Sequence, residues 1–115
     1  MRLVLVTIVC VAFLCSCTNK IKFVIENNTG KNIDSLNISS SALNSGKNIA
    51  VGKGAVVVYD LDMSDVPYVD GSYIMYCKNV KEPFRMKNFG YYTNGSPMED
   101  VIVVNIEKDT ILISY

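Results

Sequence analysis

The chain has 115 residues, with 11 basic and 11 acidic side chains, four cysteines and no histidine. This balance of charges excludes the basic surface that nucleic-acid binding requires, so no nucleic-acid partner is predicted. The absence of histidine excludes catalysis by an imidazole base and removes the commonest zinc ligand. The length allows one domain with a single core. These limits favour a binding or structural protein over an enzyme.

An apolar segment follows the first two residues of the chain. It reads LVLVTIVCVAFLC over residues 3–15, contains no charged residue and comes directly after Arg2. A short basic region followed by an apolar run is typical of a secretory signal peptide. The run is shorter than the ~20 residues that a transmembrane helix needs. Residues 1–16 are therefore predicted to be a signal peptide.

The end of this segment, Leu14-Cys15-Ser16-Cys17, resembles the lipobox of bacterial lipoproteins. In that motif a leucine at position −3 and a small residue at −1 precede the cysteine whose thiolate takes the lipid. Cys17 meets both conditions, whereas Cys15 would have Leu14 at its −1 position. The resemblance covers residues 1–17. It implies that the mature protein begins at Cys17 and that several acyl chains anchor it in the cell envelope, with the outer membrane as the expected location.

Residues 17–20 would then form the lipidated cysteine and a short tether, and residues 21–115 a single β-domain. Ile21, Phe23 and Ile25 alternate with other residues, which predicts a strand with one buried face. The period of two also predicts a strand over residues 33–39. Its two faces carry Ile33, Ser35 and Asn37 on one side and Asp34, Leu36 and Ile38 on the other.

Turn residues separate the later predicted strands. A strand at 49–51, a Gly52-Lys53-Gly54 turn and a strand at 56–61 come first, and Pro67 lies in the break that follows. The strand at 71–77 carries Tyr73, Met75 and Cys77 on one face and Ile74 and Tyr76 on the other. Apolar residues on both faces predict a central strand. A more exposed strand over 83–92 follows, and segments 100–106 and 110–115 flank a short turn and predict a C-terminal hairpin.

The fold prediction is all-β. About seven or eight short strands at this spacing favour a small antiparallel β-sandwich, with a small β-barrel as the alternative. Cys77 is the only cysteine outside residues 1–17, so the mature chain cannot form an internal disulfide. With no histidine to activate it, this thiol is predicted to be a small buried hydrophobic group.

Tyr91, Tyr92 and Asn94 form the first candidate site for a ligand or partner. Neighbouring side chains on a strand point to opposite faces, so at least one tyrosine is expected to be exposed or to cover a sheet edge. An exposed aromatic ring beside an amide can stack on a sugar or anchor a protein partner. The alternative is that both rings fill the core of a domain without tryptophan.

Four aspartates, Asp60, Asp62, Asp65 and Asp70, form a candidate calcium site. Oxygen ligands in loops at strand ends suit Ca²⁺, although the spacing differs from that of an EF-hand. The alternative is ordinary solvated turn residues. No other cofactor is predicted.

Two tripeptides, Asp34-Ser35-Leu36 and Asp109-Thr110-Ile111, resemble the acceptor sequence for O-glycosylation in Bacteroidota envelope proteins. The resemblance implies glycans on Ser35 and Thr110. Ordinary turn chemistry is the alternative.

These features lead to a functional hypothesis of a lipid-anchored, non-catalytic interaction module that binds a protein or a glycan. A structural or accessory subunit of an envelope assembly is the first alternative. A toxin-neutralising immunity-type lipoprotein is the second.

Overall fold

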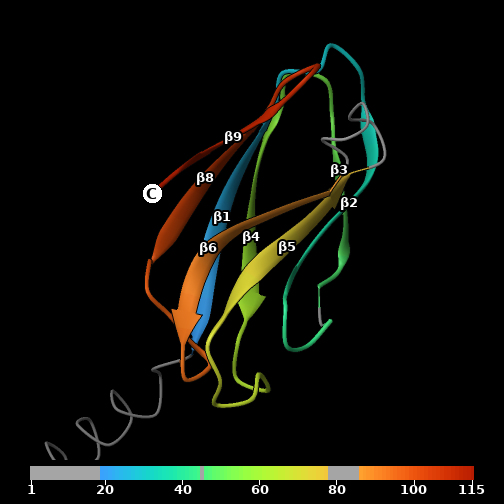
Figure 1. Ribbon diagram of the computed structural model, residues 1–115. Helices are drawn as coiled ribbons and strands as arrows, with labels where there is room; N and C mark the ends of the chain where they lie inside the picture. Colours follow the sequence, from blue (N-terminus) through green and yellow to red (C-terminus); the bar gives the residue numbers. More distant parts are fainter. Residues whose placement is uncertain (1–18, 45, 78–85) are drawn as a thin grey trace, which may run out of the picture.

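The computed structural model describes residues 19–44, 46–77 and 86–115. The predicted signal peptide and the lipid attachment at Cys17 lie outside these residues. Nine strands in two sheets make up the described part, which confirms the predicted all-β fold (Figure 1). The strands are β1 (Lys20–Asn27), β2 (Ile33–Ser40), β3 (Asn48–Val51), β4 (Val56–Asp62), β5 (Gly71–Cys77), β6 (Met86–Thr93), β7 (Ser96–Pro97), β8 (Val101–Ile106) and β9 (Ile111–Ser114).

The two sheets pack as a sandwich. One has four strands in the order β4-β1-β8-β9, and the other has five in the order β3-β2-β5-β6-β7. Every described pairing is antiparallel, as predicted, except that of β1 with β8, which is parallel. This exception is possible because β1 and β8 are joined through the rest of the domain, which supplies the long crossover that a parallel pair requires.

The core lies between the sheets and follows the predicted period of two. Ile21, Phe23 and Ile25 are buried on β1, and Tyr73, Met75 and Cys77 are buried on β5, as the alternation predicts. A group of four aromatic rings joins the sheets. The ring of Phe23 lies 5.3 Å from that of Tyr73 and 5.9 Å from that of Phe89, both edge to face, and Tyr73 lies 5.6 Å from Tyr92.

The faces of β2 differ from the prediction. Ile33, Leu36 and Ile38 are all buried, although strict alternation places Ile33 opposite the other two. The pairing of β2 with β3 shifts register between Ile33 and Leu36. An irregularity of this kind changes the face on which later residues point, so all three isoleucine and leucine side chains reach the core.

The predicted turn at residues 52–54 connects strands of different sheets. β3 pairs with β2 in the five-stranded sheet, whereas β4 pairs with β1 in the other. The fully buried Asn27 stabilises this connection between the two sheets. Its side-chain Nδ2 donates to the carbonyls of Lys31 (2.7 Å) and Val51 (3.0 Å), and its main-chain carbonyl accepts from the amide of Gly54 (3.0 Å). A buried amide with this many partners holds both neighbouring turns in place.

Gly90 lies in β6 where the pairing with β5 shifts register. Its φ is +70°, and a Cβ there would lie 2.7 Å from Cδ2 of Tyr73. Any larger residue would therefore combine an unfavourable left-handed backbone with a collision against the core.

We expect Gly90→Ala to lower the free energy of unfolding by about 2–5 kcal/mol, through backbone strain and overpacking against Tyr73. Gly54→Ala is the matched control, because Gly54 has a φ of +69° and no atom of the described part lies within 4 Å of a Cβ there. It should cost about 1–2 kcal/mol. Urea unfolding of both variants measures the difference. Equal losses would show that the Tyr73 ring moves aside.

The hydroxyl of Tyr73 is buried and finds no hydrogen-bond partner among the described residues. Tyr73→Phe should therefore leave the free energy of unfolding unchanged or raise it by up to about 1 kcal/mol. Tyr92→Phe is the comparison, because the Tyr92 hydroxyl accepts from the amide of Ala42 (3.2 Å) and bonds Ser41 Oγ (3.3 Å). That variant should lose about 1 kcal/mol. Similar losses in both variants, measured by urea unfolding, would contradict this prediction.

At alkaline pH, the stability of Tyr73→Phe should differ from that of the natural protein. Burial raises the pKa of Tyr73, and Tyr92 and Glu99 raise it further. A phenol whose pKa is higher in the folded state stabilises the fold fully below its unfolded pKa of about 10. That contribution is lost as the pH rises from about 10 toward the folded value. Stability measured at about pH 9 and about pH 11 should therefore fall more steeply in the natural protein than in Tyr73→Phe.

Candidate functional site

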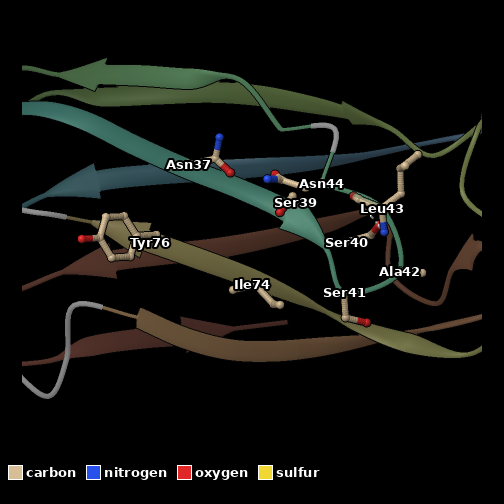
Figure 2. Close-up of a pocket in the computed structure, with 9 residues that line it drawn as sticks. All are labelled: Asn37, Ser39, Ser40, Ser41, Ala42, Leu43, Asn44, Ile74 and Tyr76. Atoms are coloured by element: carbon tan, nitrogen blue, oxygen red, sulfur yellow. Dashed lines mark hydrogen bonds between the residues drawn. The ribbon is translucent and has the colours of Figure 1, made fainter.

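A hollow of about 320 Å³, with an uncharged lining among the described residues, opens on the outer face of the five-stranded sheet, over β2 and β5. We call it the Ser/Asn hollow. Figure 2 shows Tyr76 and Asn37 toward one end of it and Ser41 and Ala42 toward the other. Its lining consists of Asn37, Ser39, Ser40, Ser41, Ala42, Leu43, Asn44, Ile74 and Tyr76.

The strands fix the floor of the hollow through their register. Asn37 of β2 lies opposite Tyr76 of β5, and Ser39 lies opposite Ile74. Side chains alternate along a strand, and the neighbouring Ile38 and other buried residues of these strands point into the core. The packing of the inner face therefore sets which groups are presented on the outer face.

The loop after β2 forms one side of the hollow. Ser40 Oγ accepts from the amide of Leu43 (3.0 Å) and donates to its carbonyl (2.9 Å), which closes a tight turn. Asn37 Nδ2 donates to the carbonyl of Gly46 (3.0 Å). Gly46 lies so close to β2 that a Cβ there would collide with the carbonyl of Ile38. The loop is thus held against the strand that it follows.

Among the described residues, no charged side chain lines the Ser/Asn hollow. Its polar groups are amides and hydroxyls, which donate and accept hydrogen bonds without a net charge. Tyr76 is 39% exposed and presents an aromatic ring beside them. The hollow therefore suits a neutral polar ligand with an apolar face.

The structure separates the two tyrosines of the sequence-predicted site. Tyr91 is 49% exposed, whereas Tyr92 is fully buried in the core. The expectation that they point to opposite faces is confirmed, and burial removes Tyr92 from the surface that a partner could contact. Asp70 holds the other two residues of the predicted site, Tyr91 and Asn94. Its carboxylate accepts from the Tyr91 hydroxyl (3.1 Å) and from the amide of Asn94 (3.1 Å), whose φ is 51°.

A second depression, of about 250 Å³, lies beside Tyr91 and is also lined by Gly90, Met98, Glu99 and Tyr115. The amide of Gly90 donates to the hydroxyl of Tyr115 (3.0 Å), which brings the end of the chain to β6. Tyr115 was not predicted as a site residue. Nothing in its sequence neighbourhood indicates a contact with residues more than twenty positions away.

The four candidate calcium ligands are divided between two places. Asp60, Asp62 and Asp65 line one hollow of about 280 Å³, whereas Asp70 bonds Tyr91 and Asn94. Asp62 accepts from the amide of Ser64 (2.9 Å), and hydrogen bonds from Ser64 together with the charge of Lys20 lower the pKa of its carboxyl.

Lysines are the cross-strand neighbours of two of these aspartates. Lys22 pairs with Asp60 and Lys20 with Asp62 in the register of β1 and β4. Within the described ranges, no group of three or more acidic, cysteine or histidine side chains is arranged to hold a metal ion. Calcium binding at Asp60, Asp62, Asp65 and Asp70 stays a prediction.

Ser35 and Thr110 are both half-buried. Ser35 lies within β2, and Thr110 directly precedes β9, where its carbonyl accepts from the amide of Glu107 (2.9 Å). Glycosylation at these two residues stays a prediction. Cys77 is buried in the core, in agreement with its expected role as a small hydrophobic group.

Sequence reasoning missed the Ser/Asn hollow. One signal for it was present, because Ile74 and Tyr76 are apolar residues on the face of β5 that the sandwich leaves uncovered. Their apolar character was interpreted as burial on both faces. Ser39 and Asn44 carried no signal, since serine and asparagine are common in loops and turns.

Comparisons with protein-family models, curated proteins and solved structures found no match. The described residues include no helix with the length and apolar character to cross a membrane.

Proposed function

We propose that this protein is a lipid-anchored, non-catalytic binding module of the bacterial cell envelope, and that the Ser/Asn hollow binds a neutral glycan. The observation that carries the ligand class is the lining of the hollow, which joins uncharged amides and hydroxyls to one exposed tyrosine ring. Sugars present hydroxyls at their rims and apolar C–H groups on their faces. The amides and hydroxyls match the first, and the ring of Tyr76 matches the second.

The same lining supports a binding role rather than a catalytic one. Apart from Tyr76, the described lining consists of serine, asparagine, alanine, leucine and isoleucine side chains, which do not exchange protons near neutral pH, and the chain contains no histidine to activate a serine. A volume of about 320 Å³ lies at the lower end of the range for small-molecule sites. A short segment of a glycan fits this size better than an extended chain does.

The lipid anchor rests on the resemblance of Leu14-Cys15-Ser16-Cys17 to a lipobox and on the apolar run before it. The folded domain begins at once after this segment, because β1 starts at Lys20. A domain attached in this way stays at the membrane surface, where envelope glycans are concentrated.

The outer face of the four-stranded sheet favours a second candidate function, as a subunit of an envelope assembly. Val24 lies opposite both Val58 and Val103, which forms an apolar row across three strands. Val58 is 56% exposed, and the nearby Val56 and Leu112 are also exposed. Apolar surface of this kind is typical of protein interfaces. A partner protein with a complementary apolar face would identify this function.

We expect Tyr76→Ala to weaken glycan binding by about tenfold, which corresponds to about 1.4 kcal/mol for the loss of one stacked ring. The measurement is titration calorimetry of the detergent-solubilised full chain with a panel of neutral oligosaccharides. Tyr91→Ala is the comparison, because Tyr91 is a similarly exposed ring outside the hollow. If Tyr91→Ala abolished binding and Tyr76→Ala did not, the glycan site would be the depression beside Tyr91. Absence of binding by the natural protein to every sugar would reject the glycan.

Substitution at the two cysteines tests the anchor. In cells, Cys17→Ala should lose labelling by a radioactive or clickable fatty acid and accumulate as the uncleaved precursor, because the acceptor thiol is missing. Cys15→Ala is the matched control and should be labelled and processed like the natural protein. The reverse pattern would place the lipid on Cys15, and labelling of neither protein would reject the anchor.

A further inference from the structure

The described chain begins at one end of the sandwich and is fixed there by hydrogen bonds. The carbonyl of Asn19 accepts from the amide of Met63 (2.7 Å), and Asn19 Nδ2 donates to the carbonyls of Gly95 (2.8 Å) and Met63 (3.4 Å). Figure 1 shows the start of β1 and the ends of β4 and β6 at this same end. Asn19 is therefore held between the connection that follows β4 and the turn that follows β6.

Four exposed apolar side chains lie at this end, and we call them the tether rim. Tyr68 is 89% exposed, Met98 60%, Tyr91 49% and Val69 48%. An exposure of 89% is unusual for a tyrosine, because the ring then covers almost no protein surface. A group of exposed apolar side chains at one end of a domain indicates a surface that is covered in the working state.

Hydrogen bonds connect the tether rim to Asn19, the first described residue. The amide of Gly95 donates to the carbonyl of Val69 (3.0 Å), and Gly95 also accepts from Asn19. The amide of Met98 donates to the carbonyl of Tyr91 (3.4 Å). The rim and the point where the chain enters the domain thus belong to one hydrogen-bonded unit.

Cys17 is two residues before Asn19, so the Cα atoms of the two residues are at most about 7 Å apart. A diacylated Cys17 lies at the level of the lipid headgroups. An anchor this short prevents the fixed end of the domain from moving away from the bilayer surface. The four side chains of the rim are then held at the depth where tyrosine is enriched in membrane proteins.

We infer that the tether rim is a membrane contact, in which Tyr68 and its apolar neighbours insert into the headgroup region of the bilayer and fix the orientation of the domain. This inference rests on the proposed lipid at Cys17. Tyrosine suits the position because its ring is apolar and its hydroxyl can stay hydrated. Because the covalent anchor already holds the domain at the bilayer, the contact is in effect intramolecular, and a few inserted side chains are enough to maintain it.

Charges near the rim predict which lipids it favours. Asp62, Asp65, Asp70 and Glu99 are exposed at this end. Lys20 pairs with Asp62 across the strands, and the exposed Lys47 lines the same hollow as Asp62 and Asp65. This excess of acidic groups is repelled by anionic headgroups. Contact should therefore be stronger on zwitterionic than on anionic vesicles, and salt should reduce the difference.

The test uses the full-length lipoprotein in vesicles of phosphatidylethanolamine and phosphatidylcholine that contain a nitroxide-labelled lipid. An environment-sensitive fluorophore is attached through Tyr68→Cys, which disturbs little because the side chain is so exposed. Lys53→Cys is the matched control. Lys53 is exposed and lies in the turn before the start of β4, at the opposite end of that strand from Asn19. The protein without either substitution gives the background from the buried Cys77.

The inference predicts several-fold stronger quenching at position 68 than at position 53, and weaker quenching at 68 when phosphatidylglycerol is added. Mass spectrometry of Cys17 and flotation with the vesicles are measured on the same samples. Equal quenching at both positions in an acylated, floating protein would overturn the membrane contact while leaving the anchor intact, and would point to a protein partner for the rim. Absence of the acyl group and of flotation would overturn both proposals.

Discussion

The contact between the aromatic rings of the two sheets holds this sandwich together. No disulfide is available within residues 19–115, and the chain has no tryptophan, so packing between the sheets supplies the stability. Phe23 of β1 meets Tyr73 of β5 and Phe89 of β6 edge to face, and all three rings are buried. Edge-to-face pairs contribute beyond the area that they bury. Gly90 has no Cβ, and this leaves the space that the Tyr73 ring occupies.

The same contact sets the geometry of the outer surfaces. Tyr92 packs against Tyr73, and its hydroxyl reaches the loop after β2 through Ser41 and Ala42. That loop forms a side of the Ser/Asn hollow, whose floor is the outer face of strands packed on the core. The polar surface at which we propose ligand binding is therefore held in place by the aromatic layer beneath it. A preformed site loses less entropy when it binds.

Periodicity in the sequence predicted the strands and most of the core. The alternation at Ile21, Phe23 and Ile25 and at Tyr73, Met75 and Cys77 identified the inner faces, because a strand that packs on one side must follow the period of two. The face of Ile33 was predicted wrongly, since a register irregularity arises from pairing with another strand and leaves no mark in the local pattern.

Candidate sites were predicted less well than strands, because they depend on long-range placement. The exposure of Tyr91 followed from local alternation, but the division of the four aspartates and the approach of Tyr115 to Gly90 depend on how distant strands are arranged. The Ser/Asn hollow also joins two segments, 37–44 and 74–76, that only the pairing of β2 with β5 brings together. Local patterns carry no information on such pairings.

The parallel pairing of β1 with β8 affects when the domain can fold. β1 lies between β4 and β8, so one of its edges has no partner until residues 101–106 have been synthesised. Contacts between residues so far apart in the sequence make folding slow. An incomplete chain therefore lacks part of the sheet on which the core packs, and the four-stranded sheet cannot be completed until residues 101–106 are available. For a chain with the proposed export signal, such a delay would leave the polypeptide extended while it crosses the membrane.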